Sequence, residues 1–244
     1  MVINVTIWNE FRHEKTSNVV KSIYPNGLHA CIKEFLYKEK DMNVTLCSLD
    51  EPEQGLSDEL LNRTDVLIWW GHMCHGEVSD TLVEKIKARV LLGMGFIPLH
   101  SAHHSKPFKA ILGTTGNLTW GREQTAIVWN LCPTHPIAKG IPSYFTLCEE
   151  LYAEPFFIPK PDDLIFGTWY EDGNIFRGGA TFTRGLGKIF YFHPGHEDCR
   201  SFFDPNVQRI INNAIRWCAP VKRTDGFVID GCIHQTEPVF KNNI

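Results

Sequence analysis

The chain lacks the glycine-rich motifs of nucleotide-binding enzymes. It contains no Gly-x-Gly-x-x-Gly sequence and no Gly-x-x-x-x-Gly-Lys-Ser/Thr loop. Such glycines let backbone N–H groups approach phosphate oxygens, so nicotinamide or ATP chemistry has no support from the sequence. We therefore expect no nucleotide cofactor.

The chain also lacks the charge pattern of a nucleic-acid-binding protein and the apolar segment of a membrane protein. Its 24 Lys and Arg residues are outnumbered by 28 Asp and Glu residues, which gives a net charge of −4. No apolar stretch approaches the roughly 20 residues that a membrane helix needs. The first residues are typical of a strand and not of a signal peptide. We expect a cytoplasmic protein with no nucleic-acid partner and no membrane partner.

No two of the eight cysteines form a Cys-x-x-Cys pair. In a chain of this size with an expected cytoplasmic location, such cysteines do not indicate a disulfide framework. We expect most of them to be free and to fill the core as small apolar residues.

Strands and amphipathic helices alternate in the first half of the chain. The expected strands are residues 2–7, 44–46, 65–70 and 96–99, and the clearest helices are 28–36, 79–93 and 105–113. This alternation indicates a parallel sheet with helices on both faces.

The second half has a different pattern. Short strands are expected at 125–131, 164–169, 175–182 and 188–192, followed by a closing helix at 207–218. The predicted fold class is therefore α/β, a doubly wound, mostly parallel sheet with added antiparallel strands. We expect a single domain over residues 1–220 and an apolar tail over 221–244, packed on its own domain or on a neighbouring subunit of a homo-oligomer.

Histidines follow the expected strands closely. The chain has 11 of them, and four strands are followed by imidazoles: His13 after the first, His72 and His75 after 65–70, His100, His103 and His104 after 96–99, and His193 and His196 after 188–192. The carboxyl ends of parallel strands border the ligand crevice of an open α/β sheet. We therefore expect these imidazoles to share one pocket.

The segments around the histidines offer several chemistries. His72 and His75 have the spacing of a metal-binding pair, although two exposed loop histidines would look the same. Ser101 follows His100 at a strand-to-helix turn, but the flanking glycines of a nucleophile elbow are missing, which favours metal chemistry over a serine nucleophile. His100 could also be a buried histidine that bonds only to the backbone.

Carboxylates accompany these histidines. Glu149 and Glu150 lie among apolar and aromatic residues, an environment that raises a carboxyl pKa and suits acid–base work. Glu197 follows the turn formed by Pro194 and Gly195, next to His196. This turn belongs to the densest polar cluster of the sequence.

Taken together, six motifs resemble the trehalose-utilisation (ThuA-like) family. They are WNEFRHE at 8–14, WGH at 70–72, LHS at 99–101, HPI at 135–137, EELY at 149–152 and GLGKIFYFHPGHE at 185–197. The resemblance runs from about residue 2 to residue 219. It implies a flavodoxin-like fold of the class I glutamine amidotransferase-like superfamily and a role in the breakdown of trehalose or related disaccharides through keto-sugars. The amidotransferases use a cysteine at the turn where this chain has His100 and Ser101, so we expect no glutaminase activity.

These observations lead to one preferred hypothesis, a metal-assisted isomerase or hydrolase that acts on a small-molecule sugar. A divalent metal, zinc by ligand type, is expected to bind His13, His72, His103 and His196. The expected catalytic residues are Glu150, His100 and Glu149, and the expected substrate-binding residues are Trp8, Trp70, Ser101 and Glu197.

Two other hypotheses remain open. The same aromatic and polar crevice would serve a sugar-binding or sensing protein without catalysis. Alternatively, Cys74 could act as a nucleophile that His72 or His75 activates.

Overall fold

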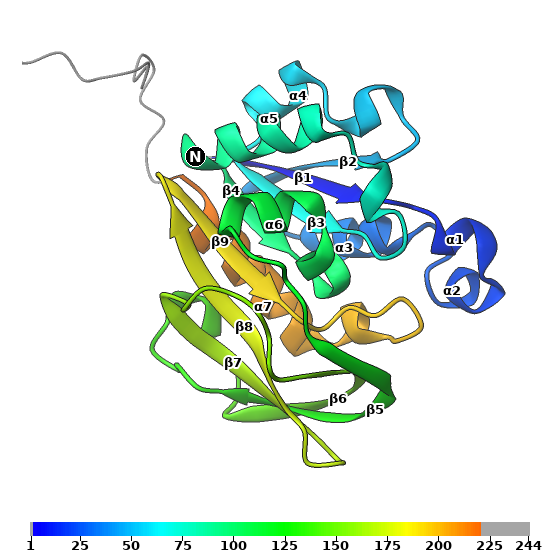
Figure 1. The fold of residues 1–244 in the computed structure, drawn as a ribbon, viewed down its shortest axis with the longest axis vertical. Helices are drawn as coiled ribbons and strands as arrows, with labels where there is room; N and C mark the ends of the chain where they lie inside the picture. Colours follow the sequence, from blue (N-terminus) through cyan, green and yellow to red (C-terminus); the bar gives the residue numbers. More distant parts are fainter. Residues whose placement is uncertain (1, 221–244) are drawn as a thin grey trace, which may run out of the picture.

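A single mixed sheet of nine strands organises the computed structural model, which describes residues 2–220. The strand order is β2-β1-β3-β4-β9-β8-β7-β5-β6 (Figure 1). The strands span β1 (Ile3–Asn9), β2 (Met42–Ser48), β3 (Val66–Trp70), β4 (Gly95–Pro98), β5 (Thr119–Asn130), β6 (Tyr144–Ala153), β7 (Asp163–Tyr170), β8 (Ile175–Arg184) and β9 (Gly187–Phe192).

The first five strands in this order are parallel, and the rest are antiparallel. The parallel part has the order 2-1-3-4-5 when its strands are numbered along the chain, which is that of flavodoxin-like folds. The predicted fold class, with a parallel core and antiparallel strands added in the second half, is confirmed.

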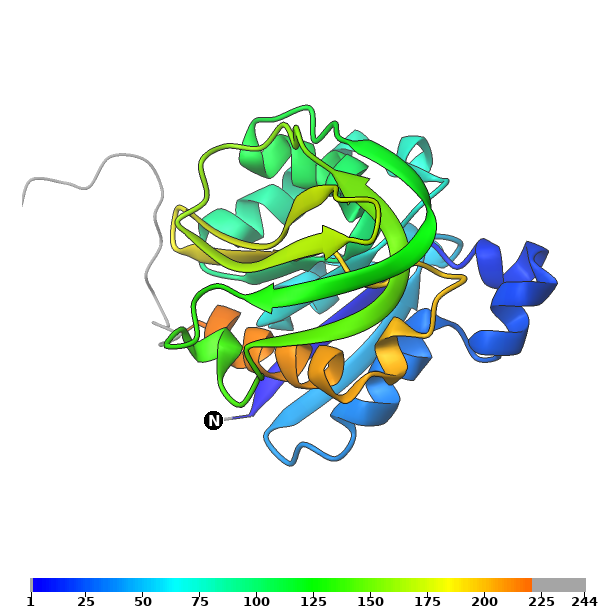
Figure 2. The ribbon, with the colours of Figure 1, turned by 90° about the horizontal axis from the view of Figure 1, so that it is seen from below.

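Helices cover both faces of the sheet (Figure 2). The α-helices span α1 (His13–Thr16), α2 (Asn18–Ile23), α3 (Leu28–Leu36), α4 (Asp58–Arg63), α5 (Asp80–Leu91), α6 (Lys106–Leu112) and α7 (Pro205–Cys218). Short 3-10 helices lie at η1 (Pro52–Gly55), η2 (His75–Glu77), η3 (His100–His104), η4 (Pro136–Ala138) and η5 (Ser201–Phe203). One core cluster contains the apolar faces of α3 and α7, and the other contains those of α4, α5 and α6.

Local sequence explains where these helices begin and end. The Ser79 hydroxyl accepts a hydrogen bond from the Leu82 N–H at the start of α5, and the Ser105 hydroxyl accepts one from the Phe108 N–H at the start of α6. Helix α6 ends at Gly113, whose φ of +67° favours glycine. These caps fix the position of the loops that precede each helix, and those loops carry histidines.

The structure also contains elements that the sequence analysis does not predict. Helices α1 and α2 lie between the first expected strand and the first expected helix, where no helix is predicted, and β6 is a ten-residue strand where no strand is expected. Two adjacent buried glutamates in β6, Glu149 and Glu150, conceal the alternation of a half-buried strand.

Three further expectations concern cysteines, membranes and the tail. The seven cysteines in the described part of the chain are free, and Cys31, Cys47, Cys199 and Cys218 are buried. Within residues 2–220, none of the helices has the length and apolarity required to cross a membrane. The predicted tail, residues 221–244, lies outside the described residues.

Candidate functional site

Histidines from four chain segments come together beyond the carboxyl ends of β1, β3, β4 and β9. These four strands are neighbours in the sheet (Figure 1). Nε2 of His13 lies 2.9 Å from Nδ1 of His72. The ring of His196 lies 5.9 Å from the ring of His72 and 5.2 Å from the ring of His100, measured between centroids. Imidazoles up to 183 positions apart in the sequence thus share one site.

The turn after β4 fixes the orientation of His100. This residue has a φ of +49°, an uncommon value for a side chain with a Cβ. Its Nδ1 lies 3.0 Å from the carbonyl oxygen of His193, to which it donates when protonated. Nε2 therefore faces the site, 3.1 Å from Oε2 of Glu150 and 3.3 Å from the hydroxyl of Tyr152.

Glu10 holds the loop that carries His72. Its carboxylate accepts hydrogen bonds from the backbone N–H groups of His72, Met73 and Cys74, at 2.8 to 3.0 Å. Ser101, which the sequence analysis assigns to substrate binding, donates its hydroxyl to the carbonyl of Gly71 at 2.7 Å. The loop is therefore held by hydrogen bonds from both Glu10 and Ser101.

Glu149 plays the same part for the loop that carries His196. Its carboxylate accepts hydrogen bonds from the N–H groups of Gly195 at 2.8 Å and His196 at 3.0 Å, and from the hydroxyl of Ser201 at 2.5 Å. The structure therefore directs the carboxylate of Glu149 at backbone groups, whereas the sequence analysis expects it to be catalytic. We assign Glu149 a positioning role.

Glu150 and Glu197 place two buried carboxylates among the imidazoles. Oε1 of Glu197 lies 3.1 Å from Nδ1 of His72 and 3.3 Å from Nε2 of His13. Burial acts to raise the pKa of each carboxyl group, but the neighbouring imidazoles outweigh it, so the net pKa of both Glu150 and Glu197 is lowered. Both groups are therefore carboxylates at neutral pH.

One oxygen of each of these carboxylates has no hydrogen-bond partner. Oε2 of Glu150 and Oε2 of Glu197 are buried and unsatisfied. Oε2 of Glu150 is close enough to His100 for an ion pair, but it is not aligned for a hydrogen bond. Buried carboxylate oxygens without partners are costly, so a bound cation is one physical explanation for them.

Two groups of side chains have the spacing to hold a metal ion. The ligand atoms of His72, His100, Glu150 and His196 all lie within 4.8 Å of one another, and so do those of His13, His72 and Glu197. A third group, Glu123, His196 and Asp198, includes two exposed acidic residues. His100, expected to be catalytic, and Glu197, expected to bind substrate, are thus brought among the possible ligands.

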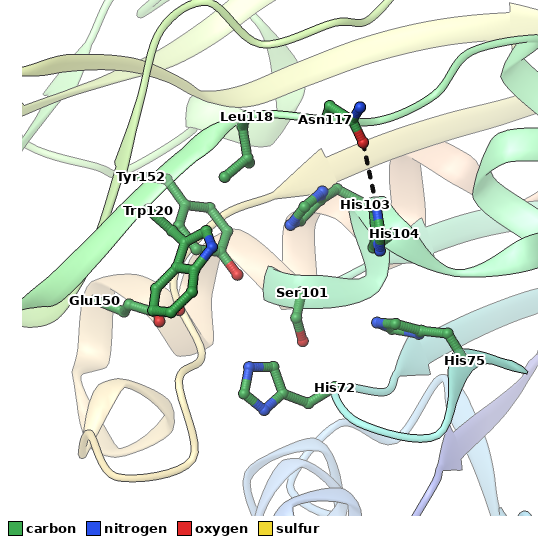
Figure 3. A pocket seen from close by; sticks show the side chains of 10 residues that line it. All are labelled: His72, His75, Ser101, His103, His104, Asn117, Leu118, Trp120, Glu150 and Tyr152. Carbon is green, nitrogen blue, oxygen red and sulfur yellow. Dashed lines mark hydrogen bonds between the residues drawn. The ribbon is translucent and has the colours of Figure 1, made fainter.

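A pocket of about 470 Å³ opens beside the first group (Figure 3). His72 and Glu150 belong both to the group and to the pocket wall, and the side chain of Ser101 also lines the pocket. The other residues that line the pocket are His75, His103, His104, Asn117, Leu118, Trp120 and Tyr152. Its volume is that of a typical small-molecule site.

His103 lies on the wall of this pocket and outside both main groups of possible ligands, contrary to its expected role as a metal ligand. Its Nδ1 lies 2.6 Å from the carbonyl oxygen of Gly116. Burial lowers the pKa of His103 to about 3, so the ring is neutral at neutral pH. The exposed neighbour His104 bonds to Asn117 at 3.2 Å (Figure 3).

The two tryptophans expected to contact substrate, Trp8 and Trp70, do not line the pocket. Trp8 is buried and stacks on Trp69, and Trp70 is buried with its indole N–H bonded to the carbonyl of Gly195. Trp120 lines the pocket instead, with 71% of its surface exposed. Tyr152 belongs to the EELY motif, but its place on the pocket wall is not predicted, because the strand β6 that carries it is not predicted.

Cys74 does not have the surroundings of an activated nucleophile. Burial and the nearby Glu77 raise the pKa of its thiol, although Arg12 opposes them. A raised pKa keeps the thiol protonated and weakly nucleophilic. The structure gives no support to the hypothesis of a cysteine nucleophile.

Comparison with known proteins identifies the family of this chain and proteins of similar fold. A sequence model described as ThuA, trehalose utilisation, matches residues 4–218. A protein described as ThuA-like from Parabacteroides merdae has 14% sequence identity and a TM-score of 0.69, over 92% of this chain and 93% of that chain. A protein described as cytoplasmic, from Salmonella typhimurium LT2, has 10% identity and a TM-score of 0.62, over 89% of this chain and 100% of that chain.

A glutamine amidotransferase from Thermotoga maritima is also similar. It has 13% identity and a TM-score of 0.49, over 79% of this chain and 75% of that chain. A search of curated proteins by sequence found no match.

Proposed function

The chain belongs to the ThuA family of trehalose utilisation, and on that premise we propose that it is a metal-assisted isomerase or hydrolase acting on trehalose or a derived keto-sugar. One observation carries the proposal. Three imidazoles and one carboxylate, from His72, His100, His196 and Glu150, place their ligand atoms within 4.8 Å of one another beside a sugar-sized pocket, and His72 and Glu150 also line that pocket.

The donor set fits a divalent ion of the zinc type. Neutral imidazoles and a carboxylate are ligands of zinc in catalytic sites. The unsatisfied Oε2 of Glu150 gives independent support, because a ligating ion would satisfy it. His100 has the supporting interaction that metal-binding histidines need, since its Nδ1 bonds to the carbonyl of His193.

Such an ion supplies Lewis-acid chemistry, which polarises a sugar carbonyl or brings adjacent hydroxyls into reach. If Glu150 and His100 act as ligands, His103 remains on the pocket wall as a neutral hydrogen-bond acceptor. Its Nδ1 donates to Gly116, which leaves a lone pair on Nε2 to accept a hydrogen bond from a sugar hydroxyl. Tyr152, whose pKa burial raises well above its usual value, stays protonated and can donate a hydrogen bond.

The exposed ring of Trp120 supports recognition of a sugar. Its flat face offers apolar surface to a pyranose ring, while Asn117 and the imidazoles of the wall offer polar partners for hydroxyl groups. A cytoplasmic location and assembly into a homo-oligomer remain predictions from the sequence.

The direct test combines metal analysis with a product assay. Protein purified without a histidine tag would be analysed for metals and incubated with trehalose and with keto-disaccharides derived from it. We expect bound metal, a new sugar product, and loss of the product after chelation. Less than about a tenth of an equivalent of metal, with activity that survives chelation, would remove the metal from the proposal.

A sugar-binding protein without catalysis is the second candidate. The hydrogen bond between His13 and His72 and the ion pair between His100 and Glu150 show that parts of the cluster have partners without a metal. Sugars that raise the melting temperature without any new product would favour this candidate. If no sugar gives a product or a thermal shift, both sugar-directed functions are contradicted.

A further inference from the structure

We propose that the site holds two divalent ions bridged by the carboxylate of Glu197. This inference deepens the proposed function and rests on its metal. It concerns the second group of possible ligands, His13, His72 and Glu197, which the single-ion proposal does not use in full.

The second group is the more tightly spaced one. Nε2 of His13 and Nδ1 of His72 are 2.9 Å apart, and Oε1 of Glu197 lies 3.3 Å from the first and 3.1 Å from the second. Two ligands of a tetrahedral zinc ion, each about 2.0–2.1 Å from the metal, lie about 3.3 Å from each other. These three atoms therefore already have the mutual spacing of metal ligands.

Hydrogen bonds alone do not account for this triangle. An imidazole nitrogen either carries one proton or offers one lone pair. If both nitrogens carried protons toward Glu197, the close pair of nitrogens would face each other without a lone pair between them. If only one of the two nitrogens carries a proton, whichever it is, the other directs its lone pair into the triangle, and no proton serves its contact with Glu197. A cation among the three atoms satisfies all of them.

Glu197 connects this group to the first one. Its Oε1 faces His13 and His72, whereas its Oε2 lies 3.7 Å from Nε2 of His196. Oε2 is buried without a hydrogen-bond partner, in a side chain with only 5% of its surface exposed. A carboxylate with one oxygen at each of two ligand groups is suited to bridge two ions.

The remaining ligands divide between the two positions. His100, Glu150 and His196 serve the position beside the pocket, where Oε2 of Glu150 is the other unsatisfied oxygen. His72 appears in both groups, but its Nδ1 lies with His13 and Glu197. Two buried carboxylates offset part of the charge of two divalent cations, which makes the pair electrostatically acceptable. Such a centre can hold two neighbouring oxygens of a sugar at once.

The test is the stoichiometry of metal binding, which does not depend on any activity. Untagged protein would be stripped with a chelator, dialysed against Zn²⁺ and analysed by mass spectrometry, and a second sample would be titrated with Mn²⁺ and followed by electron paramagnetic resonance. We expect about two equivalents of zinc and the signal of spin-coupled manganese. His13→Ala removes a partly exposed ligand of the second group only, so it should retain about one equivalent and lose the coupling.

His104→Ala is the matched control, because it removes an exposed histidine from the same pocket but outside both groups. It should retain both equivalents, and loss of one would mean that the second ion binds adventitiously. Stoichiometry of about one that His13→Ala leaves unchanged would overturn the two-ion proposal and leave the proposed function intact. No binding at all would overturn the metal in both proposals.

Discussion

Glu149 and Glu150 are consecutive residues of β6, and their carboxylates serve different parts of the site. That of Glu149 accepts hydrogen bonds from the N–H groups of Gly195 and His196, whereas Oε2 of Glu150 lies 3.1 Å from Nε2 of His100. The separation follows from strand geometry, since successive side chains point to opposite faces. One carboxylate builds the loop that carries His196, and the other faces the reactive cluster.

We predict that Glu149→Gln is mainly destabilising. An amide would turn an N–H group toward donors that now bind a carboxylate, so the free energy of unfolding should fall by about 2–4 kcal/mol. This corresponds to a melting temperature lower by roughly 5–15 °C for a chain of this size. Thermal denaturation measured by circular dichroism checks the prediction.

The matched variant is Glu150→Gln, which differs only in the carboxylate that is changed. Oε2 of Glu150 has no hydrogen-bond partner to lose, so the melting temperature should fall by less than in Glu149→Gln. Metal affinity should fall by at least about tenfold, because a ligand oxygen is removed. Equal thermal losses in the two variants would contradict the division of labour between these glutamates.

We predict that Gly195→Ala disturbs the loop of His196. Gly195 has a φ of +143°, and a Cβ placed there would lie 2.8 Å from the ring of Phe202. The strained backbone alone should cost about 1–3 kcal/mol, and the loop must move to relieve the contact. Gly76→Ala is the control, since a Cβ at Gly76 meets nothing within 4 Å. Chemical denaturation of both variants should show a clear loss only at Gly195.

Sequence periodicity predicted most of the fold because the parallel core follows simple rules. The continuous apolar run of β3 indicates burial on both faces, and the stripe of Val207, Ile210, Ile211 and Ala214 indicates the buried face of α7. The same rules fail for β6. There, buried carboxylates occupy positions that pattern alone assigns to apolar residues, and the groups that these carboxylates contact are about 50 residues away in the sequence.

The position of strand ends predicted that the histidines converge, but it could not assign their contacts. His103 and His104 are equivalent in sequence, and only the path of the chain at Gly116 and Asn117 makes one buried and the other exposed. Trp70 is expected to bind substrate, yet its ring is buried and its indole N–H donates to the backbone carbonyl of Gly195. Such assignments depend on long-range contacts that no local pattern contains.

We predict that Trp120→Ala weakens sugar binding without unfolding the protein. Most of the ring is exposed on the pocket wall, so its removal should cost binding of the order of 1–2 kcal/mol, about five- to thirtyfold in Kd, and little stability. Trp169→Ala is the control, because Trp169 is a half-exposed residue of a separate apolar hollow. Calorimetric titration with the best sugar ligand checks both variants, and equal effects would argue against the assigned role of Trp120.

We predict that Cys74→Ala retains full turnover. The protonated thiol of Cys74 lies outside the pocket lining, so no catalytic step should depend on its sulfur. Turnover with the product-forming sugar, compared with wild type, checks this expectation. A loss of more than about tenfold with an unchanged melting temperature would restore the nucleophile hypothesis.

We predict that the stability of the protein depends on pH through His103, because burial keeps this residue neutral in the folded state. Its pKa is lowered to about 3, whereas an unfolded histidine has a pKa of about 6.5. Between these two pKa values the unfolded chain binds more protons at this residue than the folded chain does. The free energy of unfolding therefore decreases as the pH falls below about 6.5. One such histidine steepens the loss by up to about 1.4 kcal/mol per pH unit.

His103→Gln should therefore flatten the dependence of stability on pH. Gln cannot be protonated in this range, so the slope of the free energy of unfolding between pH 6 and pH 4 should fall by about 1 kcal/mol per pH unit. Urea denaturation of metal-free protein at several pH values measures this slope without interference from metal release. His104→Gln, at an exposed position, should keep the wild-type slope. A wild-type slope in His103→Gln as well would show that His103 is not held neutral by burial, and it would remove the argument that this residue is a neutral hydrogen-bond acceptor on the pocket wall.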